Sequence, residues 1–370
     1  MRKLKRGVVW GFWIFTAVVL LAGLLIYRTP RPPVAALKTA REALTEALKS
    51  GAEVYAADSY AAAKQAYDSA MVCWSAENQR FFLFRNYSRL DGWIAETIEK
   101  SVKAEELSGK RSASANSRVR NGVADLDKKV AEYNKYFKRM PLPAAVSKRH
   151  NQGVLKLSEA KFAWQNNRFN EAETHFHQAK ELIERANGKA EKIVRGWFES
   201  HNTWQKLAEQ SIRLSKSGQK VILVDKLAHE CLLYQNGKVI RRFDVELGVN
   251  WMGDKVRKGD KATPEGFYRI SQKKDGSRTR FHKALLLNYP NDDDRARFAG
   301  AKRNGTLPAK ADIGGLIEFH GLGGKGVDWT DGCVALKNED MDALFRMAAV
   351  GTPVIIIGSQ KSLKEVLGKE

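Results

Sequence analysis

The order of hydrophobic and polar positions divides the chain into three stretches. Residues 8–27 form one uncharged and almost wholly apolar run, which as a helix would rise about 30 Å and match the hydrocarbon core of a bilayer. Residues 36–49 repeat their apolar side chains every three to four positions, which predicts an amphipathic helix. From Lys220 onward, short apolar runs alternate with turn residues, which is typical of β-strands.

The middle stretch predicts an all-α region. Thr29–Pro33 holds three prolines and ends the first helix, and the residues that follow are rich in Ala, Glu, Lys and Leu. We expect helix breaks at Ser108–Ser117, which is polar and rich in Ser, and at Met140–Pro143. The region is interpreted as a spacer, and a scaffold for a protein partner is the alternative.

The C-terminal stretch predicts a mainly β domain. Asn236-Gly237 between two apolar runs is the strongest short-range signal of a β-hairpin. A helix is expected at about 339–349, behind an Asn338 N-cap. The polar run Asn291–Asp294 lacks the ligand spacing of a calcium loop, so we expect a solvated surface there. Strands are expected at residues 221–224, 230–234, 239–247, 266–271, 284–287, 316–319 and 353–357.

Together these patterns predict a multidomain fold class: an N-terminal transmembrane helix, an all-α region and a mainly β domain. The basic residues before the apolar run place the N-terminus in the cytoplasm and the rest of the chain outside. A cleaved signal peptide is the alternative, although no small-x-small cleavage site follows Tyr27. The expected parts are a cytoplasmic stub with an anchor at 1–32, an α-helical extracytoplasmic region at 33–215, a β domain at 219–358 and a tail at 359–370.

Charge narrows the choice of partner. The sequence has 63 Lys and Arg against 42 Asp and Glu, a formal net charge of +21, which predicts an anionic partner. We reject nucleic acid, because the chain has no zinc-finger spacing and no short basic tract, and most of it is expected outside the cytoplasm. Anionic lipid head groups and cell-wall polymers remain.

Cys333 is the candidate nucleophile. The three cysteines, at 73, 231 and 333, are too scattered for a disulfide framework or a zinc cluster. Cys333 begins an apolar run, and His320 ends another one upstream. Neighbouring strands would bring the thiol and the imidazole within hydrogen-bond reach, as an activated thiolate requires. From the spacing alone, a buried cysteine and a structural histidine fit equally well.

Three motifs, taken in order, resemble those of one family. They are Ala262-Thr-Pro-Glu-Gly-Phe-Tyr-Arg-Ile270, Phe319-His-Gly321 and Thr330-Asp-Gly-Cys-Val-Ala-Leu336. Over residues 219–358 the chain resembles the L,D-transpeptidase catalytic domain (YkuD-type), a β-sandwich of bacterial cell-wall enzymes. The resemblance implies a peptidoglycan stem peptide as substrate and no metal or organic cofactor. Together with the apolar run at residues 8–27, we expect a periplasmic C-terminal domain on a single-pass inner-membrane anchor.

The resemblance also implies roles for individual residues. Cys333 matches the nucleophile, which attacks the carbonyl on the L-centre of the third stem residue and releases the terminal D-alanine. His320 matches the base that takes the thiol proton, and the backbone carbonyl of Gly321 would orient it. Backbone N–H groups around Gly332 and Cys333 would stabilise the oxyanion.

Two positions depart from the family pattern. Many members have a second histidine immediately before Gly-Cys and a serine before that, where this chain has Asp331 and Thr330. Asp331 is interpreted either as a group that steadies a cation or positions a nucleophile, or as a solvated turn carboxylate. Three functions therefore stay open: a thioester-forming L,D-transpeptidase, a hydrolase with the same chemistry (an L,D-carboxypeptidase or an enzyme that releases wall-bound protein), and a non-catalytic wall-binding scaffold.

Overall fold

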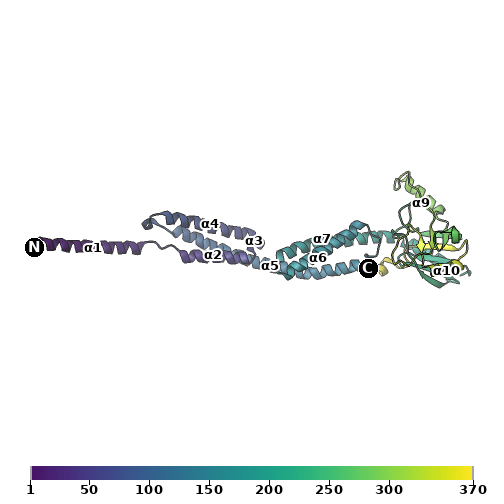
Figure 1. Cartoon of the computed structure of the whole chain (residues 1–370), viewed down its shortest axis with the longest axis horizontal. Helices are drawn as coiled ribbons and strands as arrows, with labels where there is room; N and C mark the ends of the chain where they lie inside the picture. Colours follow the sequence, from purple (N-terminus) through teal and green to yellow (C-terminus); the bar gives the residue numbers. More distant parts are fainter. Residues whose placement is uncertain (1, 369–370) are drawn as a thin grey trace. The chain divides into compact units, whose positions relative to one another are not determined.

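The computed structural model describes residues 2–368 and the side chains of residues 8–368. The chain forms two compact units, each built from more than one segment (Figure 1). The first contains the residues up to Leu126 and the segment Leu155–Lys180, and the second contains Asp127–Val154 and the residues from Glu181 onward. Three long helices contribute residues to both units.

Helix α1 (Arg2–Arg28) contains the apolar run. Its apolar side chains lie exposed along the whole run, for example Trp10 at 70% and Ile26 at 71%. Within the described residues, α1 is the one helix whose length and composition suit a membrane span. A signal sequence has the same properties.

The rest of the first unit is also helical, as the sequence predicts. Small residues lie at the contacts between its helices, where Ala40, Ala63 and Ala70 are completely buried and let the backbones approach closely. Its elements are α2 (Val34–Lys49), α3 (Ala52–Tyr55), α4 (Ala57–Gln79), the 3-10 turn η1 (Phe82–Phe84), and parts of α5 (Ser88–Tyr136), α6 (Ala144–Gln165) and α7 (Phe169–Phe198).

Of the two predicted helix breaks, one is wrong. Ser108–Ser117 lies inside α5 without interruption. Serine lowers helix propensity only modestly, and Ser108 is buried here and donates its hydroxyl to the carbonyl of Ser50 at 2.6 Å, so packing stabilises the helix at this point. The second prediction is confirmed, because Met140–Pro143 lies between α5 and α6.

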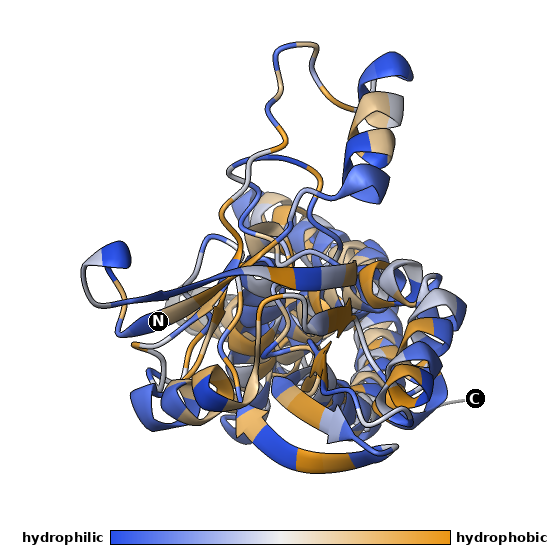
Figure 2. Ribbon diagram, turned by 90° about the vertical axis from the view of Figure 1, so that its right-hand side faces the viewer, coloured by the Kyte–Doolittle hydropathy of each residue, from blue (hydrophilic) through white to orange (hydrophobic). Residues whose placement is uncertain are grey.

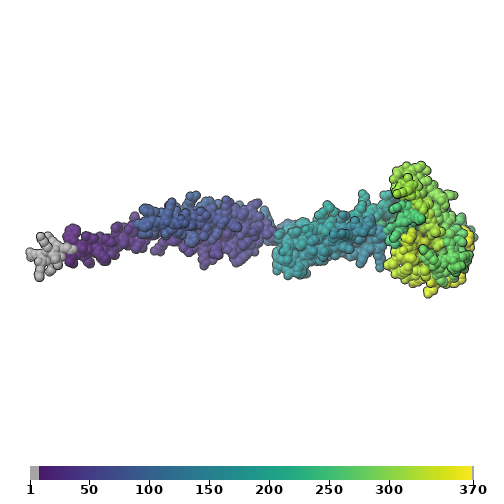
Figure 3. Space-filling model, turned by 45° about the horizontal axis from the view of Figure 1, so that its top comes forward, coloured from purple at the N-terminus to yellow at the C-terminus, as the bar shows by residue number. Residues whose placement is uncertain are grey.

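The second unit is built around a mainly β domain, which confirms the predicted fold class (Figure 3, green to yellow). Eight strands form one hydrogen-bonded series in the order β3-β2-β1-β8-β4-β5-β6-β7. Strand β4 pairs with β8 over its first residues and with β5 over the rest, with a register shift after Ile270, so the sheet curls at this strand. The strands are β1 (Val221–Asp225), β2 (Glu230–Gln235), β3 (Lys238–Asp244), β4 (Gly266–Asp275), β5 (Lys283–Leu287), β6 (Glu318–His320), β7 (Val334–Ala335) and β8 (Pro353–Ile357).

The predicted capping role of Asn338 is wrong. Asn338 is the first residue of α10 (Asn338–Met347), and no side chain caps this helix. The side-chain oxygen of Asn338 instead accepts a hydrogen bond from the N–H of Leu322 at 2.8 Å. Asn338 therefore supports the glycine-rich loop that follows β6.

Asp294 is also not the solvated residue that we expected. It is only 4% exposed, because it forms the capping box of α9 (Asp292–Arg303) with Asn291 and accepts a hydrogen bond from the hydroxyl of Tyr268 at 3.1 Å. Figure 2 shows α9 standing out from the strands at the top of the domain. The buried carboxylate of Asp294 thus fixes the base of a projecting segment.

Residues outside the β domain complete its core. Trp197 near the end of α7 and Trp204 in α8 (His201–Ser215) both donate their indole N–H groups to Glu265, at 3.1 and 2.7 Å. Glu265 also forms an ion pair at 2.7 Å with Lys226, whose side chain is completely buried. Because this carboxylate is buried with the lysine, it depends on these donors. Helix α8 therefore contributes to the core of the second unit.

We predict that Trp204→Ala destabilises the second unit by about 3–5 kcal/mol, because it removes a large buried side chain and a hydrogen bond to a buried carboxylate. The protein is unfolded in urea, and unfolding is monitored by the chemical labelling of Cys231, which is completely buried in β2. The labelled fraction is measured by mass spectrometry at each urea concentration. Lys206→Ala, an exposed position on the same helix, is the matched control and should leave the labelling midpoint unchanged. Equal midpoints for both variants would contradict the account.

Candidate active site

Strands β6 and β7 place Cys333 and His320 on one face of the sheet. The two strands pair in parallel with Phe319 opposite Val334 and His320 opposite Ala335. If this register is extended by one residue toward the N-terminus, Cys333 pairs with Glu318. Glu318 and His320 are two residues apart in β6 and therefore point to the same face of the sheet, so Cys333 and His320 share that face. Cys333 is half-buried and His320 is only 1% exposed. The structure thus places the predicted pair on one face of adjoining strands.

The ring of His320 is held on three sides. Its Nδ1 lies 2.7 Å from the carbonyl oxygen of Gly321, the ring stacks on Phe281 with centroids 3.7 Å apart, and Trp329 approaches edge-on at 5.7 Å. A carbonyl only accepts hydrogen bonds, so Nδ1 carries the proton and Nε2 keeps a free lone pair. His320 is therefore arranged to accept a proton at Nε2.

Burial keeps both groups uncharged at neutral pH. Burial raises the pKa of the Cys333 thiol to about 11, although the backbone N–H of Glu318 acts in the opposite direction. Burial also lowers the pKa of His320 below its usual value, against the effects of Gly321 and the Glu318 carboxylate. The resting site is a thiol beside a neutral imidazole, which fits general-base activation during attack better than a preformed ion pair.

Thr330 and Gly332 shape the turn before Cys333. The hydroxyl of Thr330 donates to the carbonyl of Cys333 at 2.7 Å and accepts from the N–H of Gly332 at 3.2 Å. Gly332 has a φ of +129°, and a Cβ at this position would lie 2.5 Å from the carbonyl oxygen of Ala262, so only glycine fits. The N–H of Gly332 is engaged by Thr330, and Asp331 between them is exposed.

Glu246 is a residue of the site that the sequence analysis missed. Its backbone exchanges two hydrogen bonds with Ala335, at 2.9 and 2.8 Å. Its carboxylate accepts from the N–H of Gly326 at 2.6 Å and from the indole N–H of Trp329 at 2.7 Å. Glu246 thus joins β7 to the loop that carries Trp329. The sequence feature that could have indicated Glu246 is a single Glu between Val245 and Leu247 in an apolar run.

Two further residues, from the segment between β4 and β5, also lie at the site. Phe281 stacks on His320, and the guanidinium of Arg280 lies 4.9 Å from the Phe281 ring. The charge of Arg280 lowers the pKa of His320 and of Cys333, as a secondary effect in both cases. Lys325 lowers the pKa of His320 and Lys255 lowers that of Cys333 in the same way, so Arg280 is the cation that affects both groups. No sequence signal marks this segment.

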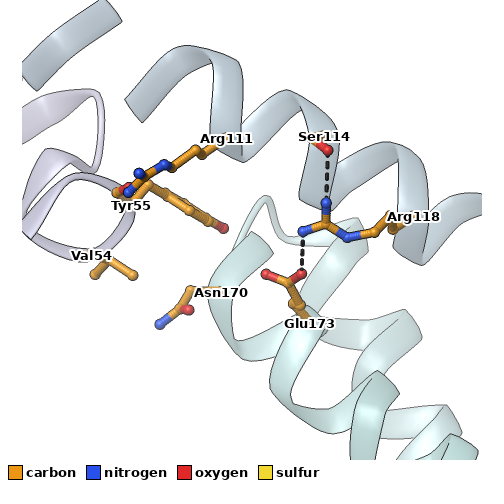
Figure 4. Close-up of a pocket in the computed structure, with 7 residues that line it drawn as sticks. All are labelled: Val54, Tyr55, Arg111, Ser114, Arg118, Asn170 and Glu173. Carbon is orange, nitrogen blue, oxygen red and sulfur yellow. Dashed lines mark hydrogen bonds and ion pairs between the residues drawn. The ribbon is translucent and has the colours of Figure 1, made fainter. Parts of the chain in front are cut away.

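Two cavities lie away from this pair. One, of about 300 Å³, is in the first unit, where Arg118 bridges Ser114 and Glu173 and Arg111 donates to the backbone of Tyr55 (Figure 4). The other, of about 290 Å³, is in the second unit and includes residues of α5 and α11 (Leu363–Leu367). Among the described residues, no group of three or more His, Cys, Asp or Glu could hold a metal ion.

Comparisons with known proteins identify the β domain. Residues 219–356 match the family model of the L,D-transpeptidase catalytic domain (YkuD). Over 154 residues the chain is 27% identical to the Bacillus subtilis protein named "Putative L,D-transpeptidase YqjB", a match that covers 40% of this chain and 77% of that protein. YafK of Escherichia coli, described in the same words, is 29% identical over 96 residues, or 26% of this chain and 31% of YafK.

Two solved structures are also similar. The helical cell shape determining protein Pgp2 of Campylobacter jejuni, solved as a point mutant, is 24% identical, with a TM-score of 0.30 over 39% of this chain and 48% of that chain. Bd1075 of Bdellovibrio bacteriovorus is 24% identical, with a TM-score of 0.30 over 41% of this chain and 52% of that chain. The chain thus spans about half the length of these two proteins.

Residues 219–356 therefore form an L,D-transpeptidase-type domain. This confirms the resemblance predicted from the three motifs. The match lies within the second unit and leaves the helical region outside it.

We predict that alkylation of Cys333 by iodoacetamide accelerates about tenfold per pH unit between pH 7 and pH 10, because the thiolate is the reactive form and the pKa of Cys333 is raised to about 11. The measurement is the modified fraction of the Cys333 peptide by mass spectrometry. A rate that is already constant above pH 8 would show a preformed thiolate and contradict the neutral resting pair.

We also predict that Glu246→Gln lowers kcat/KM for a stem peptide roughly tenfold. The Gly326 N–H and the Trp329 indole bind different oxygens of the carboxylate, and glutamine replaces one of these oxygens with an NH2 group that cannot accept. The loss should appear with little change in the urea midpoint. Glu339→Gln, an exposed position on α10, is the control. Unchanged kcat/KM in Glu246→Gln would exclude a positioning role for Glu246.

Proposed function

We propose that the protein is a membrane-anchored cysteine L,D-transpeptidase that acts on peptidoglycan stem peptides through a thioester. The observation that carries this proposal is the parallel pairing of β6 with β7 inside the family-matched region, which brings Cys333 and His320 to one face. The contact between Nδ1 of His320 and the carbonyl of Gly321 supports it further, because it leaves Nε2 free to act as a base.

In the proposed first step, the sulfur of Cys333 attacks the carbonyl carbon on the L-centre of the third stem residue while Nε2 of His320 takes the thiol proton. The bond to the terminal D-alanine then breaks, and the departing amine receives that proton from His320. A thioester remains on Cys333.

In the second step, an acceptor amine attacks the thioester carbonyl and gives its proton to His320. The carbon–sulfur bond breaks, a new amide bond forms, and the thiol of Cys333 is restored with the proton that His320 held. In this cycle Cys333 and His320 are both neutral before the first step and again after the second. The burial of both residues favours these neutral forms.

The tetrahedral intermediate of each step carries an oxyanion that needs a donor. The N–H of Cys333 has no acceptor among the described residues, and we assign it this role, whereas the N–H of Gly332 is held by Thr330. Thr330, Gly332 and Gly321 therefore act as supports of the turn and of the histidine. Asp331 is exposed beside the nucleophile and stays a candidate for positioning the second substrate.

The proposed arrangement in the cell follows from α1. We propose that α1 spans the inner membrane as a single anchor, with the helical region and the β domain in the periplasm, because its apolar side chains are exposed over the length of a bilayer core. In this arrangement residues 1–32 are the stub and anchor, 33–215 the helical spacer, 219–358 the catalytic domain and 359–370 the tail.

A hydrolase with the same chemistry is the second candidate. The exposed carboxylate of Asp331 directly before Gly332-Cys333 favours it, because a carboxylate there would orient a water molecule toward the thioester. The two candidates differ only in what receives the acyl group. Transfer to an amine yields cross-linked products, and transfer to water yields tripeptides.

The test is incubation of the full-length protein with tetrapeptide muropeptides, followed by mass spectrometry of the products. We expect cross-linked dimers, lost by roughly a thousandfold or more in Cys333→Ala. Cys73→Ala, at a partly exposed cysteine of the first unit, is the control and should keep full activity. Tripeptides without dimers would favour the hydrolase, and equal product from wild type and Cys333→Ala would exclude both.

A further inference from the structure

The loop between α4 and α5 exposes a cluster of aromatic side chains. Residues 80–85 read Arg-Phe-Phe-Leu-Phe-Arg. Phe81, Phe82 and Phe84 are 60%, 39% and 74% exposed. The ring of Phe81 lies 4.6 Å from that of Phe82 and 6.1 Å from that of Phe84, so the three form one apolar patch.

This loop is ordered by its own hydrogen bonds. The guanidinium of Arg85 donates to the carbonyls of Asn78 and Arg80 at 3.0 and 3.2 Å. The carboxylate of Glu77 accepts from the N–H of Asn86 at 2.9 Å and pairs with Arg80 at 3.1 Å. The exposure of the phenylalanines is therefore a property of a defined turn. An ordered aromatic patch on the surface indicates a partner.

The position of the loop along the helices indicates which partner. Leu37 in the first turn of α2 belongs to the same buried cluster as Tyr87 and Leu90, at the start of α5. The turn that joins α4 to α5 thus lies at the end of the unit where α2 begins (Figure 1). Five residues, 29–33, join the end of α1 to α2, and an extended chain covers at most about 3.6 Å per residue. The start of α2 therefore lies within roughly 20 Å of the end of α1.

The composition of the loop suits the surface of a lipid bilayer. Phenylalanine and leucine side chains form the buried face of segments that lie in the interface between head groups and acyl chains, and arginine binds phosphate through paired N–H donors. Arg80 and Arg89 are exposed on either side of the phenylalanines, with Arg85 partly exposed between them. Glu77 neutralises part of this charge, which leaves a net positive rim around an apolar centre.

We infer that the Phe81–Phe84 loop inserts into the interface of the membrane that α1 crosses, with its arginines on anionic phospholipid head groups. The inference rests on the proposed membrane anchoring by α1. Insertion of the loop fixes the first helical unit at the membrane through a second contact. A spanning helix already holds the chain in the membrane, so the loop adds a shallow second contact that restrains the first helical unit against the bilayer surface.

The test uses the full-length protein in nanodiscs of phosphatidylethanolamine and phosphatidylglycerol, with p-benzoylphenylalanine as a photo-crosslinker at one position at a time. Phe84→p-benzoylphenylalanine preserves an exposed aromatic side chain. Val54, which is 52% exposed in α3 beyond the other end of α2, is the matched control. Leu20, which is 69% exposed in α1, reports on the anchor itself. Lipid adducts are counted by mass spectrometry.

We expect at least tenfold more lipid adduct at position 84 than at position 54, together with lipid adducts at position 20. Adducts at position 20 without any at position 84 would overturn the inference and leave the anchor intact. Cross-links from position 84 to another protein or to a second copy of this chain would overturn it as well. Adducts at position 84 but not at position 20 would support the loop and contradict the proposed anchor.

Discussion

The parallel pairing of β6 with β7 is the interaction on which the candidate site depends. It sets Phe319 opposite Val334 and thereby puts Cys333 and His320 on one face. A slip of one residue would turn one of the two side chains to the opposite face. Gly332 makes the pairing possible, since the turn passes so close to Ala262 that a Cβ would collide with its carbonyl oxygen. The site is thus determined by backbone register and by one close approach.

Burial then determines the chemistry that this geometry supports. It disfavours the thiolate of Cys333 and the imidazolium of His320, so both groups on this face are uncharged. The carboxylate of Glu318 lies nearby but is paired with Lys274 at 2.5 Å. In the proposed mechanism, a proton therefore moves from sulfur to nitrogen as the new bond forms. The surrounding contacts, from Gly321, Phe281 and Trp329, keep the imidazole in the orientation that this transfer requires.

The sequence predicted what depends on local patterns, and failed where distant contacts decide. The Asn236-Gly237 hairpin, the helical region and the motifs around Cys333 were readable from the order of residues alone. Glu246 was not, because its partner Trp329 is 83 residues away in the sequence. The helix through Ser108 was missed because a hydrogen bond to Ser50, the residue after α2, outweighs the composition of that stretch. Asn338 serves a loop rather than its own helix for the same reason.

The central claim is that Cys333 carries the acyl group. The most direct measurement is the intact mass of the full-length protein, mixed rapidly with a tetrapeptide muropeptide and quenched in acid, with the modified peptide then sequenced. The expected result is an added mass equal to the muropeptide without its terminal D-alanine, bound to Cys333 as a thioester that hydroxylamine removes. Product formation with no adduct at any quench time, or an adduct on another residue, would contradict the claim.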